Sequence, residues 1–273
     1  MELVPIGKFK ASDYRISTMT VTGSVNTTVD LRKFFDNIDI DSYQSISFVE
    51  YGSNKNEHDQ KGVKVEKTKN SQKKPKKRFD NQMTLHMNDS EYKFNIKLFK
   101  NGNVQMTGVK NIERGKNIID ELIKIITISN KMCETHDIVE DVEQLMNCNF
   151  STRLMNCDFK VSYKINRGIL HKLLNNSFNL TCSYEPCIYQ GVKVSFYMNE
   201  YSEDGICKCA KKCLGKGHNT ICKKITIAVF QSGCVTITGS TSTYQMEFVY
   251  DYIKILLENH MNDIYQQTYQ MTA

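Results

Sequence analysis

Two stretches of the chain alternate between apolar and polar residues in the same way. The first runs from Phe94 to Gly108 and the second from Ile225 to Gly239, an offset of 131 positions throughout. In each stretch, two alternating runs flank a short turn that contains Gly, which is the pattern of a β-hairpin. Alternation with a period of two predicts antiparallel strands with one buried and one open face.

The same offset continues into a longer element after each hairpin. Apolar residues there recur at helical spacing and form one stripe of an amphipathic helix. The stripe contains Ile118, Leu122, Ile125 and Ile126 in the first half, and Val249, Ile253, Leu256 and Leu257 in the second. Since the match extends through a hairpin and a helix at one offset, the chain is predicted to contain an internal repeat.

Each half is also predicted to begin alike, with a strand followed by a short helix. The strands are residues 16–25 and 153–163, and the helices centre on 31–38 and 169–174. Further strands are expected at 46–51, 81–87, 180–184 and 191–198. The order is strand, helix, four strands and a long helix, twice over, which predicts an α+β fold. The repeats are placed at residues 1–135 and 136–273.

One sheet face in the second half has no helix left to cover it. That face is predicted to carry Lys193, Ser195, Tyr197, Thr226, Ala228, Phe230, Thr236 and Thr238. The matching face of the first half carries Asn95, Lys97 and Gln105 and is more polar. A large, partly aromatic sheet face that stays open is typical of a binding surface.

Several of these segments resemble TATA-box-binding proteins. Ser183-Tyr184-Glu185-Pro186, followed by Gly191 and the hairpin at 229–239, is similar to the second repeat of that family. The segment 98–108 resembles the matching hairpin of the first repeat. The resemblance covers residues 15–51, 79–130 and 150–260. It implies a saddle of two pseudo-symmetric repeats, in which a curved antiparallel sheet binds DNA and the helices lie on the convex side.

The resemblance also implies DNA-contacting residues. Phe99 and Phe230 match the family's side chains that insert between base steps and kink the DNA. Tyr189 matches the second inserting residue of the second repeat. Phe79 is the corresponding residue of the first repeat. Met83, Leu85 and Met87 alternate on the same face as Phe79, so if they are core residues, Phe79 points inward instead. The family's paired Asn residues on the first strand of each repeat are not clearly present, and Thr18 or Thr20, and Thr152, lie nearby. The predicted contacts are Phe79, Lys97, Phe99, Thr107, Tyr189, Lys193, Phe230 and Thr238.

By this resemblance, the chain is predicted to be a transcription initiation factor that binds and bends AT-rich promoter DNA through the minor groove. Its Asn-, Ile- and Lys-rich composition and its insertions resemble the TATA-binding-protein-like proteins of large DNA viruses. The implied partners are AT-rich duplex DNA, a viral RNA polymerase and other initiation factors, without a membrane. The implied location is an infected host cell, either a cytoplasmic viral factory or the nucleus, or the virion. The alternative is an interaction protein of the same fold that sequesters or recruits initiation factors without specific DNA binding.

Positive charge is concentrated in a first insertion, residues 53–77, and the Lys/Arg residues just after it. The segment 53–79 carries a net charge of +7, whereas the whole chain carries +6. The insertion has no periodicity and is predicted to be disordered. It could be a solvated loop, an arm that contacts phosphates, or, at Lys73–Arg78, a nuclear-import signal.

A second insertion, residues 200–222, is rich in cysteine. Its candidate metal ligands are Cys207, Cys209, Cys213, His218 and Cys222. Cys and His are the usual ligands of structural zinc, although the spacing is not that of a standard finger. The alternative is a basic loop with free thiols. No cofactor is required by the resemblance, and zinc is the one candidate.

Other classes of protein are disfavoured. The chain contains no Ser/His/Asp set, paired-carboxylate pattern or phosphate-binding loop, so we do not expect an enzyme. No run of 18 apolar residues occurs, and residues 1–15 lack the features of a secretion signal. The ten cysteines are therefore expected to be free or metal-bound in a reducing compartment.

Overall fold

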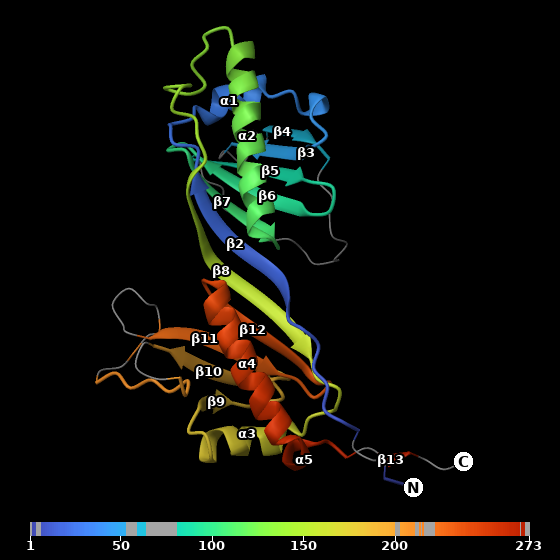
Figure 1. Ribbon diagram of the computed structural model, residues 1–273. Helices are drawn as coiled ribbons and strands as arrows, with labels where there is room; N and C mark the ends of the chain where they lie inside the picture. Colours follow the sequence, from blue (N-terminus) through green and yellow to red (C-terminus); the bar gives the residue numbers. More distant parts are fainter. Residues whose placement is uncertain are drawn as a thin grey trace. The chain divides into compact units, whose positions relative to one another are not determined.

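The computed structural model describes residues 2–3, 7–52, 59–63, 81–199, 203–210, 213, 215, 222–267 and 269–270. Contacts divide the chain into two compact units, residues 18–153 and residues 1–17 with 154–273. Each unit contains an antiparallel sheet with helices on one face (Figure 1). This division differs from the predicted boundary at 135/136 because residues 136–147 still bond to the first unit. For example, Asp30 N donates to Ile138 O at 2.7 Å, and Asn147 Nδ2 donates to Asp120 Oδ1 at 3.0 Å.

The unit of residues 18–153 contains the first repeat. Its sheet has the order β4-β3-β5-β6-β7-β2, and α2 lies across one face of it (Figure 1). Helix α1 packs against α2 and β3. The elements are β2 (Arg15–Ser24), α1 (Leu31–Asn37), the short 3-10 helix η1 (Ile40–Ser42), β3 (Ile46–Tyr51), β4 (Asp59–Gly62), β5 (Gln82–Asn88), β6 (Lys93–Phe99), β7 (Asn103–Val109) and α2 (Ile112–Met132).

Strand β4 corrects the prediction of a disordered insertion at 53–77. Residues 59–62 pair with β3, with Val49 opposite Lys61. Lys61 Nζ also donates to Ile38 O at 2.9 Å and Asp36 O at 3.1 Å, and so binds the carbonyls at the end of α1. The prediction of disorder is wrong for these residues. It is based on the absence of an apolar pattern, whereas main-chain pairing with β3 and the bonds from Lys61 to the end of α1 require no such pattern. Residues 53–58 and 64–77 lie outside the described residues.

The other unit contains the second repeat. Its sheet has the order β8-β12-β11-β10-β9, and α4 packs on β12 (Figure 1). Helix α3 contacts β9, β10 and α5. The elements are β8 (Cys148–Lys160), α3 (Arg167–Asn176), β9 (Thr181–Ser183), β10 (Val192–Met198), β11 (Lys223–Val229), β12 (Cys234–Ser240), α4 (Thr243–Asn259) and α5 (Met261–Ile264). A separate pair is formed by β1 (Glu2–Leu3) and β13 (Tyr269–Gln270).

The structure confirms the internal repeat at the level of backbone geometry. Gly108 and Gly239 both have positive φ, 88° and 102°, and each lies at a register shift where its strand contributes one extra residue. Such a bulge needs a left-handed residue, which Gly adopts without strain. The predicted helix stripes are buried in both α2 and α4. The two halves therefore share a hairpin, a bulge and a packed helix at the same offset.

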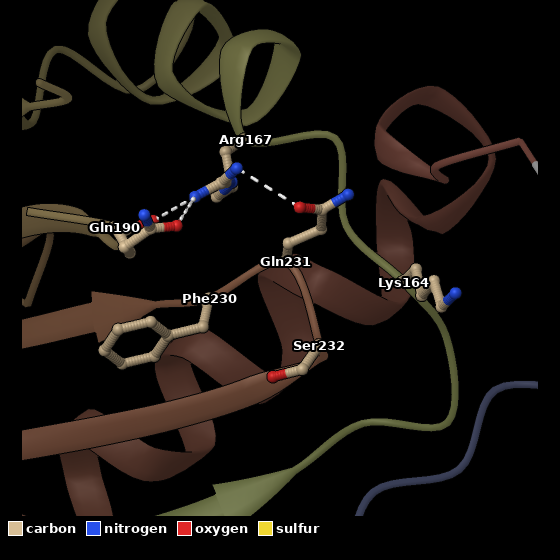
Figure 2. A pocket seen from close by; sticks show the side chains of 6 residues that line it. All are labelled: Lys164, Arg167, Gln190, Phe230, Gln231 and Ser232. Atoms are coloured by element: carbon tan, nitrogen blue, oxygen red, sulfur yellow. Dashed lines mark hydrogen bonds between the residues drawn. The ribbon is translucent and has the colours of Figure 1, made fainter. Parts of the chain in front are cut away.

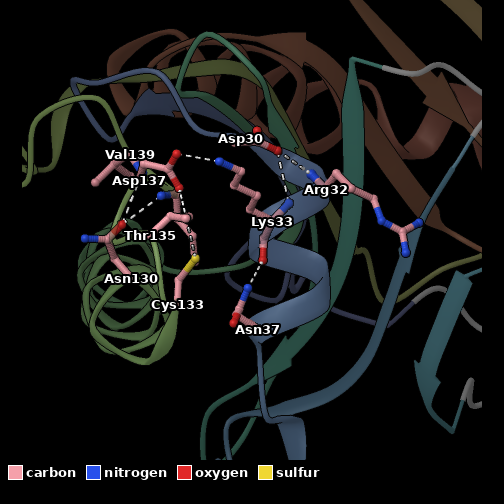
Figure 3. A network of polar contacts seen from close by, with 10 residues as sticks. Asp30, Arg32, Lys33, Asn37, Asn130, Cys133, Thr135, Asp137 and Val139 are labelled. Carbon is pink, nitrogen blue, oxygen red and sulfur yellow. Dashed lines mark hydrogen bonds and ion pairs between the residues drawn. The ribbon is translucent and has the colours of Figure 1, made fainter.

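A polar network joins the start of α1 to the end of α2 (Figure 3). Asp30 caps α1 by accepting from the backbone N–H groups of Arg32 and Lys33, both at 3.0 Å. The buried Asn130 Oδ1 accepts from Ile138 N at 2.8 Å. Lys33 pairs with Asp137, and this bond from Lys33 lowers the pKa of the Asp137 carboxyl. These contacts hold the chain after α2 against the first repeat.

The helices can be compared with the dimensions of a lipid bilayer. None of those in the described part of the chain combines the length and apolar character needed to cross a bilayer.

Candidate nucleic-acid interface

The strands of both sheets separate a buried face from a half-exposed one. On β5, Met83, Leu85 and Met87 are fully buried against the helices, whereas Thr84 and His86 point to the opposite face. The predicted inward face of the second repeat is also buried, from Val192 on β10 to Ile237 on β12. The prediction of one open face in each repeat is confirmed at this level.

In the first repeat, cross-strand pairing aligns the outward side chains into two rows across the strands. We call these rows A1 and B1. Row A1 contains Thr84, Lys97, Gln105 and Thr22, and row B1 contains His86, Asn95, Thr107 and Thr20. Asn95 Nδ2 lies 3.0 Å from His86 Nε2. The predicted residues Lys97 and Thr107 therefore lie on the open face, on neighbouring strands and in adjacent rows.

The second repeat has two matching rows, A2 and B2. Row A2 contains Lys193, Ala228, Thr236 and Asp158, and row B2 contains Ser195, Thr226, Thr238 and Asn156. Thr238 occupies the same place as Thr107 in the first repeat, next to the bulge glycine. Asp158 brings a carboxylate to this face, but it pairs with Arg15 at 2.8 Å, which offsets its charge.

Asn156 is a residue of the open face that the sequence analysis missed. Thr152 was placed nearest to the family's Asn on this strand, whereas the register of β8 against β12 puts Asn156 directly beside Thr238. A thirteen-residue strand allows several registers, so its pairing could not be read from alternation alone. The Asn156 Oδ1 atom is buried and has no hydrogen-bond partner within the described residues.

At the end of the open face of the second repeat, two aromatic side chains meet. The rings of Tyr189 and Phe230 lie 5.7 Å apart between centroids, and Lys193 Nζ lies 4.0 Å from the centre of the Tyr189 ring. Both rings are only partly exposed. The structure therefore brings together three of the predicted contacts, Tyr189, Lys193 and Phe230, in one cluster.

A hollow of about 470 Å³ lies beside Phe230 (Figure 2). Its lining includes the basic residues Lys164 and Arg167. Arg167 donates to the main-chain O of Gln190 and, at 3.2 Å, to Gln231 Oε1. Arg167 thus ties the segment after Tyr189 to the turn after Phe230, and it adds positive charge next to the aromatic pair.

The first repeat presents Phe99 at the equivalent hairpin. Phe99 lies between two hollows, of about 350 and 500 Å³, with Arg153 lining the first and Lys100 the second. Arg153 Nε donates to Thr22 Oγ1 at 2.9 Å, which holds the guanidinium at the edge of row A1. Phe99 has no aromatic neighbour within the described residues. Phe79 lies outside them, so its predicted role stays a prediction.

The predicted metal ligands are also partly brought together. The sulfur atoms of Cys207, Cys209, Cys213 and Cys222 all lie within 4.8 Å of one another, whereas His218 is outside the described residues.

These features define a class of protein: an α+β chain of two repeats, each with an open, hydroxyl-bearing sheet face that ends in an aromatic hairpin. No family model matches the sequence. The chain is 30% identical over 264 residues to a protein named TATA-box-binding protein-like from Acanthamoeba polyphaga mimivirus. That alignment covers 92% of this chain and 66% of the relative, so the chain spans just under two thirds of the relative's length.

A solved structure, that of Methanococcus jannaschii TBP, matches the fold with a TM-score of 0.51 and 16% sequence identity. The match covers 91% of this chain and 99% of that chain. The chain is similar to TATA-box-binding proteins in sequence and in fold, and both the recognised resemblance and the α+β fold class are confirmed.

Proposed function

We propose that this protein binds AT-rich duplex DNA through the minor groove, with the open sheet face of each repeat against the bases. The observation that supports this most is the repeated placement of one aromatic tip and one threonine. Phe99 with Thr107, and Phe230 with Thr238, occupy equivalent positions on the open faces of the two repeats. TATA-box-binding proteins are an established example of proteins that insert apolar side chains between base steps from the minor groove.

The chemistry of the open faces suits this target. An A·T pair presents only acceptors in the minor groove, and a G·C pair adds the guanine amino group. The hydroxyls of Thr20, Thr107 and Thr226 can donate to such acceptors, and that of Thr238 can do so by exchanging its 3.4 Å bond to Thr226 O. The unpartnered Oδ1 of Asn156 is an acceptor, so a water molecule or a guanine amino group, and not the acceptors of an A·T pair, would satisfy it. A buried, unpaired acceptor costs about 1–3 kcal/mol, which a bound ligand or water can relieve.

The direct test measures the affinity of the full chain for a short AT-rich duplex and for a GC-rich duplex of equal length. Fluorescence anisotropy at two salt concentrations separates base preference from phosphate attraction. We expect tighter binding to the AT-rich duplex at both. Equal affinity for the two duplexes, falling steeply with salt, would assign the binding to positive charge alone.

The basic residues beside the aromatic tips are expected to contact phosphates. Lys100 and Lys164 line the hollows next to Phe99 and Phe230. Each phosphate contact contributes about 0.9 to the slope of log K against log salt, so Lys100→Gln and Lys164→Gln should each lower the slope by roughly that amount. Lys124→Gln, on α2 and away from the open face, is the matched control. An unchanged slope in both variants would place the DNA elsewhere.

A second function has one observation in its favour. Rows A1 and B1 are polar at every position, with Lys97, Asn95 and His86 among them, whereas row A2 includes Ala228. Such a face suits a protein partner, and the chain would then sequester or recruit initiation factors without specific DNA binding. Absence of binding to either duplex would favour this function.

The biological setting follows from the relative. Because the matched relative is a mimivirus protein, we assign this chain to transcription initiation on viral promoters. The expected partners are a viral RNA polymerase and its other initiation factors, and the expected place is an infected cell. Co-purification of the tagged chain with polymerase subunits from infected cells tests this assignment.

A further inference from the structure

The loop between β10 and β11 gathers four cysteine side chains at one end of the second repeat's sheet. Cys207, Cys209 and Cys213 come from the loop, and Cys222 directly precedes β11. The Cys209 and Cys222 sulfur atoms are 3.6 Å apart, and those of Cys207 and Cys222 are 3.9 Å apart. A disulfide requires about 2.05 Å, so neither pair is cross-linked. None of the four forms a disulfide.

These distances match a metal site. Four sulfurs bonded to zinc at about 2.3 Å lie at the corners of a tetrahedron whose edges are about 3.8 Å. We propose that Cys207, Cys209, Cys213 and Cys222 bind one structural zinc ion. The four sulfurs complete the tetrahedron, as in other structural zinc sites, and leave no position for a fifth ligand. His218, a candidate in the sequence, is not needed.

The main chain on both sides of the cluster is anchored to the sheet. Tyr197 N on β10 donates to Gly205 O at 2.8 Å, and Lys224 N on β11 donates to Gly215 O at 2.9 Å. At Gly215 the chain approaches β11 so closely that a Cβ would lie 2.3 Å from Lys224 Cβ. Cys207, Cys209 and Cys213 therefore lie between two anchored glycines, next to Cys222 at the start of β11, which brings the four sulfurs together before any ion arrives.

The composition of this loop explains why it needs a cross-link. Between Glu203 and Cys222 the residues are mostly small, polar or basic, with only Ile206, Leu214 and Ile221 as large apolar side chains. Long loops without secondary structure are costly to order, and an apolar core of this size cannot offset that cost. Metal binding supplies folding free energy directly in such segments.

Polar groups around the cluster suit a site with net negative charge. A zinc ion with four thiolates carries a net charge of −2, and the Asn199 side chain donates from Nδ2 to Cys222 Sγ at 3.7 Å. Lys223 and Lys224 follow Cys222 directly in sequence, and Lys208, which lies between two ligands in sequence, pairs with Asp204 at 2.9 Å. An N–H donor such as Asn199 Nδ2 stabilises a thiolate ligand and is part of a metal site's design.

The test measures metal in the full-length protein, purified without added zinc. Mass spectrometry of the metal content should give about one zinc per chain. Replacement by Co²⁺ should give the intense visible absorption of a tetrahedral tetrathiolate. In Cys222→Ser, the affinity for zinc should fall by more than about 100-fold. Removal of a residue that only hydrogen-bonds to a metal ligand typically lowers the affinity by about 10–100-fold, and the loss of a ligand itself should cost more. Cys187→Ser removes an exposed thiol outside the cluster and should change neither readout.

A second readout keeps the proposal testable if Cys222→Ser does not fold. The wild-type protein is treated with a chelator and digested briefly with trypsin, and zinc alone is then added back. Cleavage after Lys208 should increase on chelation and be suppressed again by zinc. Purified protein that contains iron instead of zinc, or that holds no metal and gains no protection from added zinc, would overturn the proposal. Neither result depends on DNA binding.

Discussion

A protein that carries both Phe99→Ala and Phe230→Ala is expected to bind an AT-rich duplex at least roughly 30-fold more weakly than the wild type. Stacking of one aromatic side chain on a base contributes about 1–3 kcal/mol, so removal of two costs at least about 2 kcal/mol. Each ring lies at the end of an open face with a hollow beside it, and neither is part of the buried core. Loss of the rings should therefore leave the fold intact.

The same double variant should also lose its ability to bend the duplex. A wedge between base steps kinks DNA, and without it the remaining contacts meet a nearly straight groove. Energy transfer between dyes on the two duplex ends measures the bend, and anisotropy at fixed salt measures the affinity. Tyr244→Ala removes an exposed aromatic residue on α4, outside the open face, and should change neither quantity. If the double variant bends the duplex as much as the wild type does, neither phenylalanine inserts between base steps.

The single variants distinguish the two repeats. Phe230 has Tyr189 as a neighbour at 5.7 Å, whereas Phe99 has no aromatic neighbour in the described part of the chain. In Phe230→Ala, the Tyr189 ring can move towards the vacated space and retain part of the stacking. We therefore expect Phe99→Ala to cost more affinity than Phe230→Ala.

Elements with a strong local pattern could be predicted from the sequence. Residues 46–51 form β3 with the predicted bounds, and the hairpins at 94–108 and 225–239 have the predicted faces. The hairpin segments alternate between buried and half-exposed residues along most of their length, and their turn glycines recur at one offset. Because each signal is local, it requires no knowledge of how distant segments pair.

Features that depend on long-range pairing were missed. Strand β4 exists because β3 offers a free edge and because Lys61 reaches the end of α1, neither of which its polar sequence reveals. Asn156 reaches the open face through the register of β8 against β12. The cysteine spacing suggested five candidate ligands, and the close approach of the loop to β11 brings four of their side chains together, whereas His218 lies outside the described residues. In each case two segments far apart in sequence had to be placed together.

The packed helices lead to a second large effect, on stability. Leu122 on α2 and Ile253 on α4 are equivalent in the repeat and are 0% and 1% exposed. Substitution of such a residue by Ala leaves a cavity and costs about 2–5 kcal/mol in the free energy of unfolding. We expect Leu122→Ala and Ile253→Ala each to fall in this range, which is a large fraction of the stability of a typical protein.

Urea denaturation followed by circular dichroism measures both losses, and each helix offers its own control. Ile128 and Ile255 lie on the same two helices but are 42% and 53% exposed, so Ile128→Ala and Ile255→Ala should change stability by no more than about 0.5 kcal/mol. Since Ile253 and Ile255 have the same side chain and lie two positions apart, any difference between them comes from the face of α4 that each occupies. Equal losses at both positions would mean that α4 does not pack on its sheet through the stripe that repeats from α2.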